Sequence, residues 1–174
     1  AIIGEALKGA FNNSDYRNNE YIKYFSKLRQ EYVNRYNVFK SLIMGIDSIN
    51  DLNTRKQVLN LLKEYASDND YYKLLDNGIN HVNIMNNLEP EAGFFLLLNF
   101  NELKDMHYKD MVIKNEFDLL KYFYNTIKLR YILGSGCLWP NSGDIIGRFT
   151  FAKSYEDLID VSCLMNNSIK KLVK

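Results

Sequence analysis

The sequence predicts an α+β domain: a small sheet of about four strands packed on one side by helices, with a long N-terminal amphipathic helix. Three observations predict this fold. They are a helical repeat of apolar residues over 20–44, several short runs of strand length, and a capped amphipathic helix near the C-terminus. The chain has 174 residues, 47% of them hydrophobic, which is enough for one good core. We expect residues 1–19 to be a connection and residues 20–174 to form the domain.

The first half of the chain contains two predicted helices. The stretch 20–44 repeats apolar side chains three or four residues apart, and Gly45 is the expected end of this helix. A second helix is predicted over 54–66, with Val58, Leu61, Leu62 and Tyr65 facing inward, and 70–75 adds a turn or two. The stripe of the long helix consists of Tyr21, Phe25, Leu28, Tyr32, Tyr36, Phe39 and Ile43.

Two strands should follow. Residues 78–85 alternate in polarity, which places His81 at the sheet surface, and 94–100 is a continuous apolar run typical of a strand covered on both faces. Turn residues around Pro90 separate these strands. A polar loop that contains His107 then leads to a helix over 114–128. The predicted core stripe of that helix is Phe117, Leu120, Phe123, Tyr124 and Ile127.

The last part of the chain predicts two more strands and a helix. The strands cover 130–136 and 145–152, separated by a loop that contains Trp139 and Pro140. Ser154 caps the final helix in a variant capping box with Asp157. The order of the strands in the sheet cannot be predicted. The buried face of the final helix is expected to consist of Leu158, Val161, Met165, Ile169 and Leu172.

Charge and hydropathy indicate no nucleic-acid and no membrane partner. The net charge is +1, and the basic residues are spread along the chain without a dense run that would follow phosphates. The longest apolar run, 94–98, is far shorter than the roughly 20 residues of a membrane span. The chain opens without a secretory signal, and its two cysteines, Cys137 and Cys163, lie in unrelated contexts. We therefore expect a reduced, cytoplasmic chain, with a disulfide as the open alternative.

Arg148 is the most informative single residue. It lies in an otherwise apolar strand, between Gly147 and Phe149. A planar guanidinium on a rigid strand makes two parallel hydrogen bonds to a carboxylate, which fixes the orientation of a ligand as well as its charge. The alternative is a solvent-facing arginine, or one paired with a structural acid.

Three stretches together resemble the C-terminal small domain of the fold-type I (class I/II) pyridoxal-phosphate-dependent aminotransferases. "YFSKLRQEYVNRYNVF" is similar to the family's long helix, with Arg35 near the second arginine of its pattern. "EPEAGFFLLLNF" resembles the family's glycine and aromatic strand, with Gly93, Phe94 and Phe95 matching. "YILGSGCLWPNSGDIIGRFTFAKSYEDL" resembles its glycine loop, arginine strand and following helix. The resemblance covers roughly 20–172.

The resemblance implies a function for Arg148. In the family, the arginine at this position binds the α-carboxylate of the amino-acid or 2-oxo-acid substrate. Pyridoxal phosphate is held by a large domain, to which 1–19 would connect, and the family is usually dimeric, so a homodimer is one expected state. The family's S-x-x-K and N-P segments are absent here, so we expect no catalytic and no cofactor-binding residue, and no activity from the isolated chain. Whether the parent catalyses transamination or another reaction of this cofactor stays open.

Other interpretations have less support in the sequence. His81 and His107 lack ligand-spaced partners, so no metal site is predicted, and Gly134 and Gly136 are not followed by a third glycine of a dinucleotide site. Cys137 is expected to pack, with a reactive thiol as the alternative, and Trp139 is expected to be a packing or lid residue. The chain begins at Ala1 without methionine, which indicates a fragment or a processed product. A stand-alone, non-enzymatic α/β interaction module is the alternative function.

Overall fold

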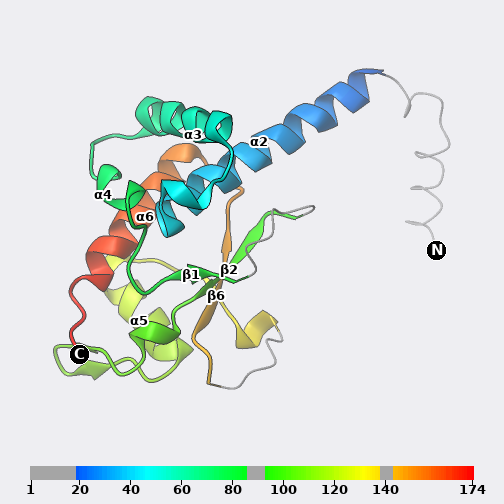
Figure 1. The fold of residues 1–174 in the computed structure, drawn as a ribbon. Helices are drawn as coiled ribbons and strands as arrows, with labels where there is room; N and C mark the ends of the chain where they lie inside the picture. The colour runs from blue at the N-terminus through cyan, green and yellow to red at the C-terminus, as the bar shows by residue number, and fades with distance from the viewer. Residues whose placement is uncertain (1–18, 86–92, 138–142) are drawn as a thin grey trace, which may run out of the picture. The chain divides into compact units, whose positions relative to one another are not determined.

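A computed structural model describes residues 19–85, 93–137 and 143–174, and it has the predicted α+β fold (Figure 1). The described residues form five helices and a four-stranded antiparallel sheet of order β1-β2-β6-β5, with a separate β3-β4 hairpin. The predicted connection over 1–19, except its last residue, lies outside the described residues, as do Pro90, Trp139 and Pro140. The elements are α2 (Asn19–Met44), α3 (Leu52–Tyr65), α4 (Tyr72–Leu75), β1 (Asn83–Ile84), β2 (Phe95–Asn99), β3 (His107–Tyr108), β4 (Met111–Val112), α5 (Glu116–Ile127), β5 (Ile132–Leu133), β6 (Ile146–Thr150) and α6 (Tyr155–Ile169).

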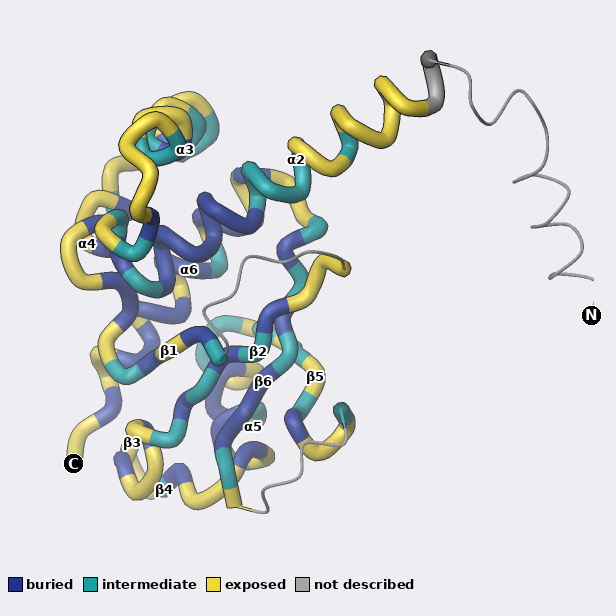
Figure 2. Tube along the Cα trace, turned by 45° about the vertical axis from the view of Figure 1, so that its right-hand side comes forward, coloured by how far each residue is buried: buried dark blue, intermediate teal, exposed yellow. Residues whose placement is uncertain are grey.

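Helix α2 confirms the long predicted helix and ends at Gly45, whose φ of 84° stops it. The chain divides into two compact units, 1–33 and 34–174, so the two parts of α2 are described separately. In the first, the predicted stripe residue Phe25 is 53% exposed. In the second, every residue over 36–43 is buried, even Lys40, whose ammonium lies over the Tyr36 ring (Figure 2).

The sheet has one buried and one open face. In the β2-β6 ladder Leu96 pairs with Phe149 and Leu98 with Gly147, and all four are buried. The other face carries Phe95 and Ile132, which are 44% and 42% exposed. The helices therefore pack on one side, as predicted. The prediction that 94–100 would be covered on both faces is wrong, because among the described residues no helix covers the second face.

Two predicted details around the histidines are wrong. The strand expected over 78–85 is reduced to Asn83–Ile84, and His81 lies in a turn with φ 65°. His107, expected in a loop, lies in β3 and pairs with Val112 of β4 and with Val173 near the C-terminus. The bridge from His107 to Val173 joins segments that are distant in the chain, which sequence periodicity does not report.

Helix α5 has its predicted bounds to within two residues, but its predicted core face is only partly correct, because Phe123 is buried as predicted and Phe117 and Tyr124 are not. The buried apolar residues are Leu119, Tyr122 and Phe123, whereas Phe117 is 63% exposed and Tyr124 39% exposed. Tyr122 is held inward because its hydroxyl donates to the carbonyl of Ser168 at 2.7 Å.

Helix α6 follows its prediction closely. The Ser154 hydroxyl accepts from the Asp157 amide at 3.1 Å, which caps the first turn. Leu158, Met165 and Ile169 are buried as predicted, and Val161 is half-buried. Helices α3 and α5 both pack against α6.

Candidate functional site

Arg148 lies in the middle of β6, an inner strand of the sheet. It pairs across the ladder with Leu97 of β2 on one side and with Ile132 of β5 on the other. Because directly opposed residues share a face of an antiparallel sheet, its side chain projects from the open face. Arg148 itself is half-buried. The backbone of this residue is thus fixed on both sides by strand pairing.

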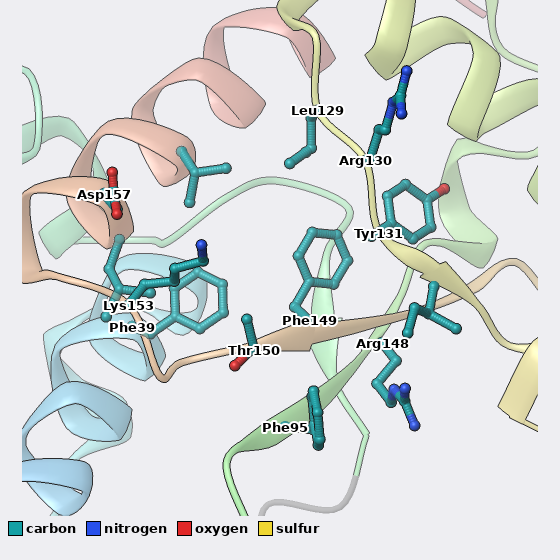
Figure 3. Close-up of a pocket in the computed structure, with 13 residues that line it drawn as sticks. Phe39, Phe95, Leu129, Arg130, Tyr131, Arg148, Phe149, Thr150, Lys153 and Asp157 are labelled. Carbon is teal, nitrogen blue, oxygen red and sulfur yellow. The ribbon is translucent and has the colours of Figure 1, made fainter.

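The guanidinium of Arg148 packs on an aromatic ring. Its carbon Cζ lies 4.4 Å from the centre of the Phe95 ring, in a cation–π contact (Figure 3). Its Nε is buried and has no hydrogen-bond partner. No ion pair joins Arg148 to an acidic residue in the described part of the chain. A buried donor without an acceptor is unfavourable, and a carboxylate would relieve this.

A hollow of about 360 Å³ adjoins this arginine. It forms because β5 pairs with β6 only through Ile132 and Leu133, so the preceding residues over 129–131 line the hollow instead of extending the ladder. Figure 3 shows Arg148 and Phe95 on one side of β6 and Phe149 and Tyr131 on the other. The residues that line the hollow therefore come from both sides of β6.

Tyr131 packs on the buried face of β6, on the other side of the strand from Arg148 (Figure 3). Its ring stacks on Phe149 at 4.9 Å between centroids and covers Gly147, where an added Cβ would meet the ring at 2.7 Å. The Tyr131 hydroxyl is buried without a partner, and burial, with the nearby Glu116 carboxylate, raises its pKa well above the usual range. Only glycine at 147 leaves room for the Tyr131 ring to pack against this face of β6.

The charged groups of the hollow are mostly basic. Its lining includes Arg130, Arg148 and Lys153, and the single carboxylate in the lining is that of Asp157. Arg130 lies toward α5, where one of its terminal nitrogens donates to the Tyr124 hydroxyl at 3.1 Å. Lys153 lies on the helix side of the sheet, away from Arg148 (Figure 3). Arg148 is therefore the group best placed to receive an anion at the open face.

The hollow does not offer what pyridoxal phosphate requires. The cofactor needs a lysine and a carboxylate directed at its ring, together with donors for its phosphate. The one lysine and one carboxylate of the lining, Lys153 and Asp157, lie across the sheet from Arg148 (Figure 3). The described lining of this hollow therefore does not fit the cofactor, and Arg148 is the candidate ligand for a carboxylate in it.

The other residues that the sequence brought forward lie apart from this hollow. Arg35 lies over the Tyr155 ring at 5.7 Å. His81, for which no acidic partner was predicted, contacts the Glu102 carboxylate through Nδ1 at 3.0 Å. The amide of Ser135 donates to Glu116 at 3.2 Å. Within the described ranges no group of three or more potential metal ligands occurs.

The sequence did not identify Phe95 or Tyr131 as site residues. Phe95 was noted only for its match to a family strand, and its contact with Arg148 depends on the β2-β6 register, which was unknown.

A search of protein-family profiles gives no match to this chain. No curated protein matches it either. Among the helices described, none has both the length and the apolar character to cross a membrane.

Proposed function

We propose that this chain is the C-terminal small domain of a fold-type I pyridoxal-phosphate-dependent aminotransferase, and that Arg148 binds the α-carboxylate of the amino-acid or 2-oxo-acid substrate. One observation carries the proposal. A guanidinium on an inner strand is packed against Phe95, its Nε is buried without an acceptor, and no acid pairs with it among the described residues.

The contacts of Arg148 suit two-point binding of a carboxylate. Phe95 covers a face of the guanidinium, which fixes the plane of the group and leaves its edges for hydrogen bonds. A carboxylate that accepts from Nε and from one terminal nitrogen would satisfy the orphan donor and gain a charge-assisted pair. The partly buried setting strengthens this interaction relative to water.

In this proposal the rest of the parent protein supplies the cofactor and its lysine. The large domain packs over the open face of the sheet, where Phe95 and Ile132 are exposed. The small domain closes over bound substrate and presents Arg148. The isolated chain is then inactive, binds no pyridoxal phosphate, and belongs to a cytoplasmic parent. A homodimer through the uncovered apolar face is a further expectation for the fragment.

The reading frame upstream of Ala1 tests this assignment against the alternative of a stand-alone, non-enzymatic module. S-x-x-K and N-P segments are expected within about 250 residues, the upper range of a domain. A start codon immediately before Ala1 would favour the module. Pyridoxal-phosphate-dependent turnover by the isolated chain would contradict the proposal directly.

The parent enzyme then tests the residue. Arg148→Gln should lower kcat/KM for the amino-acid substrate by about a hundredfold or more, because two charge-assisted hydrogen bonds are lost. Lys153→Gln, in the same hollow but on the other side of the sheet, is the matched control and should change it little. Equal losses in both variants would mean that Arg148 has no specific contact with substrate.

A further inference from the structure

The outward face of helix α5 carries a second, separate feature. The sequence predicted that Phe117 and Tyr124 would be core residues, but they are 63% and 39% exposed. With Lys121 and Lys128 they recur at intervals of three or four residues, so all four share one stripe. From Phe117 to Lys128 the stripe extends about 16 Å, at the helical rise of about 1.5 Å per residue. We call these four residues, with Leu120 and Arg130, the α5 stripe.

The residues that follow α5 complete the hollow beside this stripe. Lys128 adopts a left-handed conformation with φ 57°, which ends the helix and reverses the chain. Arg130 is thereby placed over the Tyr124 ring, with Cζ 4.7 Å from its centre, and donates to the Tyr124 hydroxyl at 3.1 Å. A hollow of about 350 Å³ lies here, lined by Phe117, Leu120, Lys121, Tyr124, Arg130 and Tyr131.

The α5 stripe is cationic and lacks carboxylates. The Lys128 ammonium lies 5.3 Å from the centre of the Tyr124 ring. The hydrogen bond from Arg130, with the charges of Arg130 and Lys128, lowers the pKa of the Tyr124 hydroxyl. The carboxylates near the start of α5 are engaged with backbone amides. Asp118 accepts from Lys114 at 3.0 Å, and Glu116 accepts from Ser135 at 3.2 Å. Neither lines the hollow.

We propose that the α5 stripe is a docking site for an acidic peptide segment of a partner protein, one that carries carboxylates beside aromatic or aliphatic side chains. Charge complementarity selects the occupant. The exposed Phe117 ring and Leu120 receive apolar side chains, and Lys121, Lys128 and Arg130 receive the carboxylates. The length of the stripe matches about three turns of a bound helix.

The same observations disfavour a nucleic acid as the occupant. Single-stranded nucleic acids bind where bases stack on free aromatic faces and where many cations follow the phosphates. Here Arg130 and Lys128 already lie over the Tyr124 ring, and three cations form a short cluster. The two hollows share Arg130 and Tyr131, but this proposal uses neither Arg148 nor the proposed aminotransferase function.

Fluorescence anisotropy with the intact chain tests the site. The probe is a short labelled peptide in which glutamates alternate with leucine and phenylalanine, compared with a peptide that has lysine at each glutamate and with a labelled oligothymidylate. We expect saturable binding of the acidic peptide alone, weakened by added salt. Arg130→Gln and Lys121→Gln should each weaken binding of the acidic peptide by about two- to fivefold, the loss expected for an exposed charge pair. Lys56→Gln on α3 is the matched control and should leave it unchanged.

Phe117→Ser provides a second, uncharged test, since this exposed ring contributes little to the core. This variant should lower the affinity for the acidic peptide about tenfold, while the far-ultraviolet circular dichroism spectrum stays unchanged. The proposal is overturned if the chain binds the lysine peptide as tightly as the acidic peptide, or if it binds the oligonucleotide more tightly. It is also overturned if the α5 stripe variants bind the acidic peptide as tightly as the parent chain does.

Discussion

Replacing Arg148 with methionine should stabilise the isolated chain. The arginine Nε is buried without a hydrogen-bond partner, and no carboxylate in the described part of the chain offsets the charge. Methionine has a similar reach and would keep an apolar contact with Phe95, but it leaves no donor to be satisfied. Arg148→Met therefore removes an unfavourable group and keeps most of the packing.

The size of this effect follows from two opposing contributions. An unsatisfied buried donor costs about 1–3 kcal/mol. The cation–π contact, with Cζ 4.4 Å from the Phe95 ring centre, contributes about 0.5–1 kcal/mol at a partly exposed site and is lost. The net gain in the free energy of unfolding is about 1 kcal/mol, which raises Tm by about 2–4 °C for a chain of this size.

Urea denaturation followed by circular dichroism measures this gain. Lys153→Met, an exposed change in the same hollow, is the control and should stay within about 0.5 kcal/mol of the parent chain. A clear decrease in the free energy of unfolding for Arg148→Met would refute the reasoning. Arg148 would then have a stabilising structural partner, and its proposed role as a carboxylate ligand would lose its physical basis.

Three further outcomes are expected from the described contacts. Gly147→Ala should destabilise the chain by about 1–3 kcal/mol, because the new methyl would meet the Tyr131 ring at 2.7 Å; a neutral result in the same denaturation assay would contradict that packing. Ser154→Ala should cost about 1 kcal/mol through loss of the α6 cap, whereas Ser154→Asp should retain it. Burial and nearby aspartates raise the pKa of Cys163 to about 11, so its thiol stays protonated at neutral pH. Iodoacetamide labelling followed by mass spectrometry should show half-maximal reactivity near pH 11, and a midpoint near the ordinary value of about 8.5 would show an exposed thiol.

Local signals in the sequence predicted those elements that depend on local interactions. The helical repeat of α2, the Gly45 stop and the Ser154 cap each act within a few residues. The helix, its end and the cap are found as predicted, although Phe25 of the predicted α2 stripe is exposed. The β3-β4 hairpin could not be predicted, because its strands have two residues each and β3 is also paired with Val173, far along the chain. Its stability comes from tertiary pairing and not from any sequence period.

Helix α5 shows why its orientation could not be predicted from the sequence. Two sets of apolar residues recur at helical spacing, one containing Phe117 and Tyr124 and the other Leu119, Tyr122 and Phe123. Periodicity alone gives both sets equal weight. The second set is buried because α6 packs against it, and the Tyr122 hydroxyl is tied to the carbonyl of Ser168 there. The exposure of the first set is what creates the α5 stripe.

Arg148 differs from these cases because a conflict with its surroundings made it recognisable from sequence. The neighbouring residues of its strand are mostly apolar and favour burial, whereas the charged guanidinium favours water. The residue type at this position therefore disagrees with the pattern of its strand. The structure resolves only part of the conflict. Phe95 packs against the guanidinium, strand pairing fixes its backbone, and Nε stays without an acceptor. Since Arg148→Met is expected to fold better, stability gives no reason for arginine at this position. In our proposal the reason is the substrate carboxylate that it binds in the parent enzyme.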